Sequence, residues 1–235
     1  MLRSDLIQAP EALHPSLWLA SQLAHGAQRC LDTGFATLSA QLPGDGWPTG
    51  CLVDLLVQQP GSGELRLLGP ALARLQQPIV LLQPPHAPQA LALAALGLPP
   101  SRLLWLRSAR GGDALWAAEQ VLRSGSCGAL LFWQQHVRGD TLRRLHLAAQ
   151  GGDTLFCMLR PLAAALDASP APLRLSLRPA AGGIDIGFVK RRGPQRDTPL
   201  FLPLTPSSVL QRHAPLDRPT LAPAPARGVL SELVG

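Results

Sequence analysis

The stretch CLVDLLVQQPGSGEL, residues 51–65, decides the fold of this chain. Its first seven residues, Cys51 to Val57, form an almost continuous apolar run with the length and composition of a buried β-strand. A glycine-rich turn follows, and behind it apolar residues recur with helical spacing from Gly63 to Leu75. The stretch therefore predicts a strand, a tight turn and a helix, which is the arrangement of a phosphate-binding loop.

Beyond this stretch, short apolar runs alternate with helical patterns as far as residue 159. Asp113 is expected to cap one of the helices and Gly125 to end it. The expected strands are Ile79–Leu82, Leu103–Leu106, Ala129–Trp133 and Leu155–Leu159, and the expected helices are Gln89–Leu96, Ala114–Arg123 and Asp140–Gln150. Apolar strands that alternate with helices predict an α/β fold with a mainly parallel sheet flanked by helices.

The pattern changes after residue 171 to an alternation with a period of two. Leu173, Leu175 and Leu177 alternate with Arg174, Ser176 and Arg178, and a second alternating run, Ile184 to Phe188, follows Gly182-Gly183. This indicates a β-hairpin with one solvated face, so we expect an antiparallel extension at one edge of the sheet, to which Leu200–Leu204 adds a last strand.

The chain divides into three parts on these patterns. Residues 1–30 hold an N-terminal helical segment, residues 31–203 form the α/β domain, and residues 204–235 are expected to be a flexible, proline-rich tail. The N-terminal segment carries Leu17 and Trp18 on one helical face, and the tail ends in an apolar cluster of Val229, Leu230, Leu233 and Val234. Both clusters are candidates for docking on a partner; a frayed terminus is the simpler interpretation of the second.

The positive net charge suggests nucleic-acid binding, but the composition as a whole does not establish it. The chain has 235 residues, 46% hydrophobic and 15% charged, with a net charge of +6, and Lys190 is its only lysine. Such an excess of arginine over lysine is typical of a compositional bias, so the net charge does not establish nucleic-acid binding. The four cysteines lack the spacing of a zinc or disulfide framework and are expected to be reduced. A signal pattern and an apolar run long enough for a membrane span are both missing, so the protein is expected in the cytoplasm, with no membrane partner.

The glycine-rich turn has the shape of a phosphate-binding loop without its chemistry. Such a loop needs a lysine for the β- and γ-phosphates and a hydroxyl residue for Mg²⁺, but these two places hold Glu64 and Leu65. We therefore interpret Gly61, Ser62, Gly63, Glu64 and Leu65 as a degenerate loop that only starts a helix. The chain shows no catalytic or metal-binding constellation, and we expect no cofactor and no enzymatic activity.

Five further segments around the loop are distinctive: Thr33-Gly34, Leu42-Pro43-Gly44-Asp45-Gly46, Leu103–Gly125, Gly128–Trp133 and Val189-Lys190-Arg191-Arg192. Over residues 31–203, in unbroken order, these segments and the loop resemble the RecA recombinase family. Pro85 stands where that family has its catalytic glutamate, and Trp133 stands where it has the aspartate that coordinates Mg²⁺. The resemblance therefore implies a RecA-like scaffold that does not hydrolyse ATP, since four nucleotide-handling positions are replaced.

Five motifs carry a more specific resemblance: His14-Pro15-x-x-Trp18, Leu42-Pro43-Gly44-x-Gly46-Trp47-Pro48, Pro60-Gly61-x-Gly63-Glu64-Leu65-Arg66-Leu67-Leu68, Asp113-Ala114-Leu115-Trp116-Ala117-Ala118-Glu119 and Val189-Lys190-Arg191-Arg192-Gly193. Together they resemble the ImuA family, SOS-mutagenesis proteins related to both RecA and the division inhibitor SulA. The resemblance implies a non-catalytic accessory protein of translesion DNA synthesis that acts with an ImuB-type polymerase homologue and an error-prone polymerase III alpha-type subunit. RecA, DNA in a weaker contact and a second copy of the chain are further candidate partners. The alternative is a SulA-like inhibitor that binds the division-ring protein.

Basic and aromatic side chains supply the candidate contact residues. Lys190, Arg191 and Arg192, with Arg196, contact either DNA phosphates or an acidic partner, or they form a solvated strand end. Arg143 and Arg144 are adjacent on one expected helix, so their side chains point about 100° apart. Among the tryptophans, Trp105 and Trp133 are expected to be wholly or partly buried, and Trp116 to be a core anchor, although tryptophans also serve as stacking platforms for single-stranded bases.

Overall fold

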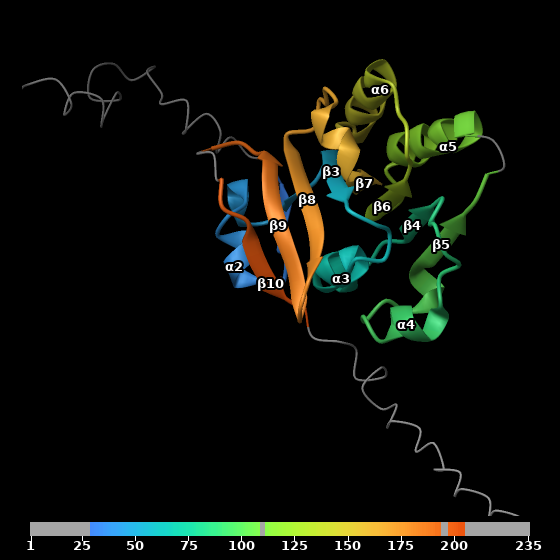
Figure 1. The fold of residues 1–235 in the computed structure, drawn as a ribbon. Helices are drawn as coiled ribbons and strands as arrows, with labels where there is room; N and C mark the ends of the chain where they lie inside the picture. The colour runs from blue at the N-terminus through green and yellow to red at the C-terminus, as the bar shows by residue number, and fades with distance from the viewer. Residues whose placement is uncertain (1–28, 109–110, 194–196, 205–235) are drawn as a thin grey trace, which may run out of the picture.

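The computed structural model describes residues 29–108, 111–193 and 197–204 (Figure 1). These residues form a mixed α/β structure around one large sheet, with a small two-stranded sheet beside it. The predicted fold class, a mainly parallel sheet flanked by helices with an antiparallel hairpin at one edge, is confirmed. Candidate residues Leu17, Trp18, Arg196, Val229, Leu230, Leu233 and Val234 lie outside the described residues.

The described residues place eight strands in the large sheet, in the order β10-β9-β8-β3-β7-β6-β4-β5. The run from β8 to β5 is parallel, whereas β9 and β10 are antiparallel to their neighbours. The strand bounds are β3 Cys51–Val57, β4 Ile79–Leu82, β5 Leu103–Leu106, β6 Ala129–Trp133, β7 Leu155–Pro161, β8 Leu173–Ala180, β9 Gly183–Lys190 and β10 Leu200–Pro203. All seven residues of β3 are buried, because strands pair with it on both sides and helices cover both faces.

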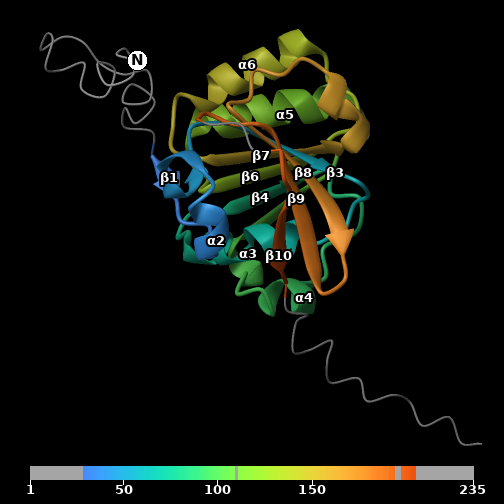
Figure 2. The same cartoon turned by 60° about the vertical axis from the view of Figure 1, so that its left-hand side comes forward.

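Helices cover the two faces of this sheet as separate layers (Figure 2). On one face, α5 (Gly111–Ser124) and α6 (Gly139–Ala149) pack their apolar side chains over the middle of the sheet. On the other face, α3 (Glu64–Arg74) and the short α4 (Ala90–Ala94) enclose a second apolar cluster. The middle strands β3, β4 and β6 are thus buried between two apolar layers, as expected for the interior of a parallel sheet.

A small element precedes the sheet in sequence. β1 (Cys30–Leu31) pairs antiparallel with β2 (Trp47–Pro48), and α2 (Ala36–Ser39) lies between them in the chain. Gly34 has a φ of +80°, and a β-carbon there would collide with Pro70 of α3. The Thr33-Gly34 pair therefore serves a close approach between this segment and α3.

In α5 and β8, three expectations about individual residues are wrong. Helix α5 begins at Gly111, so Asp113 lies in its first turn and does not precede the helix as a cap. The side chain of Trp116 is 63% exposed, because Ala114, Ala118 and Leu122 form the buried face of this helix. The alternating pattern of β8 predicted that Arg174 lies on a solvated face, but this residue is 5% exposed and lies in the interior.

No helix among the described residues is long and apolar enough to cross a bilayer.

Candidate functional site

The glycine-rich turn after β3 has the predicted strand–turn–helix geometry. Gly61 and Gly63 have φ angles of +83° and +108°, a left-handed conformation that glycine adopts without strain. Helix α3 begins at Glu64, directly after Gly63. The Ser62 hydroxyl donates a hydrogen bond of 2.5 Å to the Gln59 carbonyl oxygen and so ties the turn together.

The carboxylate of Glu64 occupies the inside of this turn. Its Oε1 atom accepts a 2.7 Å hydrogen bond from the backbone N–H of Gly61, and the residue is only 2% exposed. A negative charge in the first turn of a helix is favoured by the helix dipole. The chain therefore places its own anion at the backbone donors that a phosphate-binding loop offers to a nucleotide.

Pro85 and Trp133 both lie near the carboxyl edge of the sheet. Pro85 follows β4 and is exposed, whereas Trp133 ends β6 and is 8% exposed. Both line a cavity of about 400 Å³ beside the turn. The prediction that Trp133 is wholly or partly buried is confirmed. The same prediction for Trp105 is wrong, because this residue of the edge strand β5 is 48% exposed.

A buried ion cluster links three neighbouring strands, and the sequence patterns did not reveal it. Asp54 of β3 accepts hydrogen bonds from Arg160 Nε and Nη2 of β7, at 2.9 and 2.6 Å, and from Arg174 Nε of β8, at 3.0 Å. Arg174 Nη2 also donates to the carbonyl oxygen of Ala164, in the 3-10 helix Leu162–Leu166. The signal that could have revealed the cluster was an aspartate inside the apolar run of residues 51–57, which requires a buried partner.

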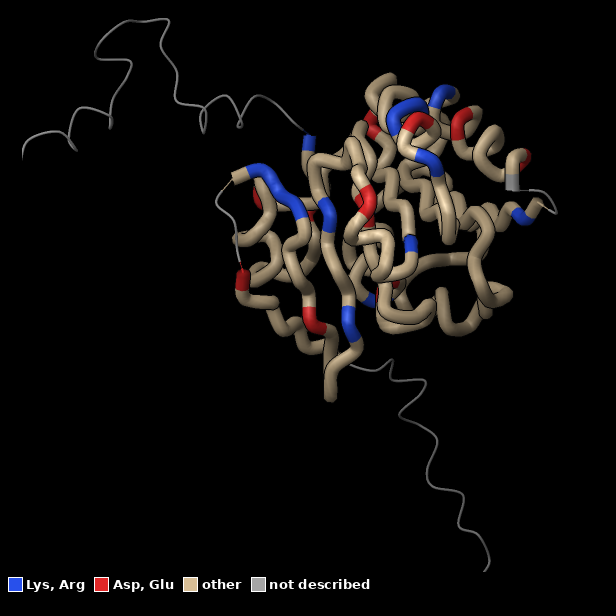
Figure 3. The backbone as a smooth tube through the Cα atoms, turned by 45° about the horizontal axis from the view of Figure 1, so that its top comes forward, with Lys and Arg blue, Asp and Glu red and all other residues tan. Residues whose placement is uncertain are grey.

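The basic residues Lys190 to Arg192 lie at the end of β9 and directly after it (Figure 3). The Lys190 ammonium donates a hydrogen bond to the Ser169 carbonyl oxygen at 3.2 Å. Arg191 turns elsewhere: it donates to the Gln41 carbonyl oxygen at 2.5 Å and stacks over the Phe188 ring, 5.1 Å from its centroid. Arg192 lines a separate polar cavity, so the three basic side chains have different surroundings.

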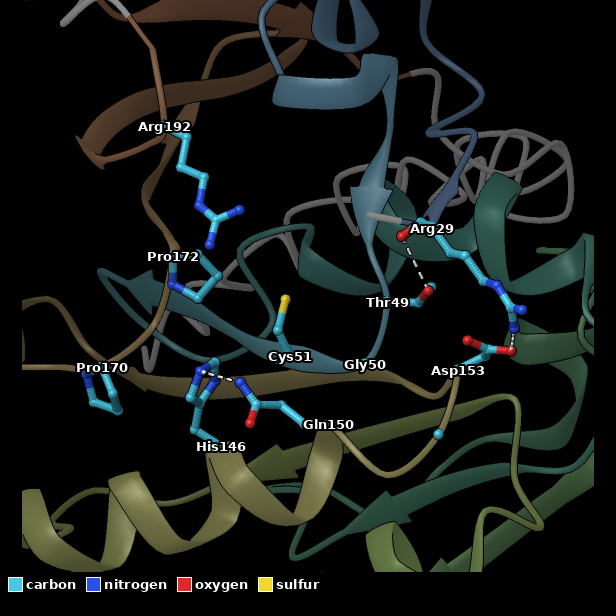
Figure 4. A pocket seen from close by; sticks show the side chains of 11 residues that line it. Arg29, Thr49, Gly50, Cys51, His146, Gln150, Asp153, Pro170, Pro172 and Arg192 are labelled. Atoms are coloured by element: carbon cyan, nitrogen blue, oxygen red, sulfur yellow. Dashed lines mark hydrogen bonds and ion pairs between the residues drawn. The ribbon is translucent and has the colours of Figure 1, made fainter. Parts of the chain in front are cut away.

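This polar cavity, of about 380 Å³, lies at the amino edge of the sheet (Figure 4). Figure 4 shows Arg192 extending from one side toward the space above Cys51 and His146, with Gln150 on the floor. On the far side, Arg29 forms an ion pair with Asp153. The cavity therefore gathers cationic and amide groups, and its acidic residue is engaged by Arg29.

His146 has a defined tautomer in this cavity. Its Nδ1 atom accepts a 3.2 Å hydrogen bond from the backbone N–H of Leu52, so in the neutral ring Nε2 carries the proton. Its Nε2 atom lies 3.4 Å from the amide nitrogen Nε2 of Gln150. Burial lowers the pKa of His146, and the positive charges of Lys190 and Arg192 lower it further.

Arg143 and Arg144 of α6 have separate partners, as expected from their angular separation. Arg143 pairs at 2.9 Å with Asp140 of the same helix. Arg144 Nε lies 2.8 Å from Glu119 of α5, which also pairs with Arg123. Arg144 therefore holds the two helices together, and both guanidinium groups already have an acidic neighbour.

The cysteines and the other metal-ligand residues form no cluster in the described part of the chain. Cys51, Cys127 and Cys157 are buried thiols, and Cys30 is half-buried. Burial raises the pKa of the Cys157 thiol far above its ordinary value. The described residues contain no group of three or more His, Cys, Asp or Glu side chains placed to hold a metal ion.

The fold and the turn define a mixed α/β protein whose parallel sheet keeps a phosphate-loop geometry with a carboxylate inside it. No protein-family model matches the chain. Over 87 residues, which are 37% of this chain, it is 34% identical to the cell division inhibitor SulA of Edwardsiella piscicida. The aligned part covers 52% of that protein, so the chain spans about half the length of the curated relative it matches. The chain thus has partial sequence similarity to SulA.

Proposed function

We propose that this protein is a non-catalytic adaptor of damage-induced, mutagenic DNA synthesis. It acts beside an ImuB-type polymerase homologue and an error-prone polymerase III alpha-type subunit. The motifs shared with the ImuA family support this role, and the partial similarity to SulA supports its placement among proteins of the SOS response.

The observation that carries the non-catalytic part of the proposal is the position of Glu64. A bound triphosphate would have to displace a buried carboxylate from the Gly61 N–H and then lie against its negative charge. Leu65 supplies no oxygen for Mg²⁺ at the next position. Pro85 and Trp133, which line the cavity beside the turn, stand where the RecA family has a glutamate and an aspartate. Neither side chain is a carboxylate, so neither replaces the missing metal ligand.

Contact with DNA is a secondary part of the proposal. Lys190 and Arg192 lie at the amino edge of the sheet, where Arg29 also lines the polar cavity. Phosphate contacts made by such residues would weaken steeply with salt because binding releases counterions. We assign this edge a weak, sequence-independent contact that assists the protein contacts.

The similarity to SulA favours one other function, inhibition of cell division by binding the division-ring protein. The two functions predict different partners for the same chain. Division inhibition would arrest polymerisation of the division-ring protein directly, whereas the adaptor would not.

The deciding experiment is a pull-down of the tagged full-length chain from damage-treated cells, compared with untreated cells. We expect the ImuB-type protein and the polymerase subunit to be recovered from treated cells. Recovery of division proteins with neither polymerase would favour the second function. Failure of the purified chain to bind a soluble, purified ImuB-type protein would contradict the proposed one.

A further inference from the structure

The cavity at the carboxyl edge of the sheet has the place and the lining of a ligand site. It lies at the ends of β3, β4, β6 and β7, the edge at which open parallel sheets bind ligands. Its volume of about 400 Å³ is within the range of small-ligand and peptide pockets. Its polar lining is dominated by amides: Gln58, Gln59, Gln83, Gln134 and Gln135.

Trp133 brings a buried donor without a partner to this cavity. Its residue is 8% exposed, and its indole Nε1–H has no hydrogen-bond partner among the described residues. A buried donor left unsatisfied destabilises the folded state. Nε1 itself has almost no accessible surface, so the indole has to turn toward the cavity before an acceptor oxygen of a ligand reaches it, and that bond then offsets the penalty.

Gln83 is held in a strained backbone conformation at the same place. Its φ is +55°, which is uncommon for a residue with a side chain. Its backbone N–H donates to Leu106 O at 2.9 Å, and its amide Nε2 donates to Ser108 O at 2.7 Å. These bonds fix the amide at the wall of the cavity, and strain of this kind concentrates at ligand sites.

The charge of the lining selects the class of ligand. Arg160 is the lone charged residue among the described lining residues. Its Nε and Nη2 pair with Asp54, whereas Nη1 lies 3.5 Å from Asp167 and has no hydrogen-bond partner among the described residues. Because Asp54 and Asp167 balance the charges of Arg160 and Arg174, the lining offers no net positive charge to a phosphate group. The aromatic residue of the lining, Trp133, is buried and so presents no open ring for stacking a base.

We propose that this cavity binds an extended, uncharged peptide segment of the protein partner. On binding, the Trp133 indole turns so that a main-chain carbonyl of that segment accepts its N–H, and the glutamine amides pair with the backbone groups of the segment on either side. The inference rests on the proposed adaptor function, and it turns the edge that would serve nucleotide chemistry into a peptide-binding site.

Indole N–H resonances test this directly, because the chain has five tryptophans. A ¹⁵N-labelled full-length chain gives one indole signal for each, and Trp133→Phe assigns the signal of Trp133. On addition of the unlabelled ImuB-type protein, we expect the Trp133 proton to move downfield and to exchange more slowly with solvent. Trp47 is the control, since its Nε1 is also buried without a partner but lies outside the cavity; its signal should stay in place.

The possible outcomes distinguish a failure of the peptide site from a failure of the proposed adaptor function. Binding of the partner with an unmoved Trp133 signal would overturn the peptide site and leave the adaptor role standing. No binding at all would overturn both. Movement of the Trp133 signal on addition of Mg-ATP alone would assign the cavity to a nucleotide and overturn the inference.

A pair of glutamine substitutions provides the affinity test. Gln135 is exposed, so Gln135→Glu should fold normally while placing a carboxylate opposite the peptide carbonyl oxygens. We expect the affinity for the ImuB-type protein to fall about tenfold, as calorimetry would measure. Gln76→Glu makes the same change at an exposed position outside the cavity lining and should leave the affinity unchanged. Equal affinities for the two variants would overturn the inference.

Discussion

Two charged clusters in this protein differ in what surrounds them. Asp54, Arg160 and Arg174 lie on three adjacent strands, buried, with the carboxylate bonded by both guanidinium groups. The residues at the end of β9 and directly after it, Lys190 to Arg192, are instead at least partly exposed and contact different partners. In the first cluster each charge depends on the others for its place in the interior, whereas in the second each charge is also solvated. Charge inside the sheet therefore stabilises the fold, and charge at its edge is available to a partner.

The largest effect is expected when the buried cluster is broken. Asp54→Ala leaves two buried guanidinium groups without their carboxylate, so the free energy of unfolding should fall by about 4 kcal/mol, as urea denaturation would measure. Asp167→Ala is the control, because its carboxylate is 3.5 Å from Arg160 but its side chain is 60% exposed. That variant should lose less than about 1 kcal/mol. Equal losses for the two variants would contradict the distinction between inner and outer charges.

Glu64 is an intermediate case, a buried carboxylate bonded to a single backbone donor. Glu64→Ala removes the acceptor of the Gly61 N–H, so the free energy of unfolding should fall by about 1–2 kcal/mol. Glu64→Gln keeps an acceptor oxygen and should lose less. A stabilised Glu64→Ala variant would show that the carboxylate does not hold the turn.

His146 links the amino-edge charges to pH. Its folded pKa lies below its ordinary value of 6.5, so the unfolded chain binds the proton more readily than the folded protein does. The contribution of neutral His146 to the free energy of unfolding should therefore be fully present above pH 6.5 and decline as the pH falls below it. Protonation of Nδ1 also breaks the hydrogen bond from the Leu52 N–H. Thermal unfolding across this range should show the decline, and His146→Gln should remove that part of it. An unchanged pH profile in the variant would refute the assignment.

The smallest effect on stability is expected at the exposed cluster. Lys190→Ala and Arg192→Ala should each change the free energy of unfolding by less than about 0.5 kcal/mol. Their effect belongs to DNA binding, where each lost phosphate contact should reduce the slope of log K against log salt by about 0.9 for duplex DNA. Binding that does not weaken with salt would rule out a phosphate contact.

Hydrophobic periodicity predicted the fold because a strand that is buried on both faces is an almost continuous apolar run, which the sequence shows directly. The predicted Ile79–Leu82 and Ala129–Trp133 agree with the buried strands β4 and β6 residue for residue. Leu103–Leu106 also agrees with β5, although three of its four residues are exposed at the edge of the sheet. The same periodicity misplaced Arg174 and Trp116. An alternating strand does not reveal whether its polar face meets solvent or a buried carboxylate, and Trp116 lies outside the narrow alanine-rich face by which α5 packs.

The sequence also located the degenerate loop, since missing residue types are visible without coordinates. It could not show that the Glu64 carboxylate turns inward to the Gly61 N–H, because that contact depends on the left-handed glycines and the depth of the turn. The amide-lined cavity beside it brings together the ends of four strands. Its residues are far apart in the chain, so only the fold assembles them.

The central claim is that this protein binds its partner without using a nucleotide. Calorimetry of the purified full-length chain with an ImuB-type protein, with and without Mg-ATP, tests it most directly. We predict binding of equal affinity under both conditions and no heat from Mg-ATP added to the chain alone. Binding that requires Mg-ATP, or none under either condition, would contradict it.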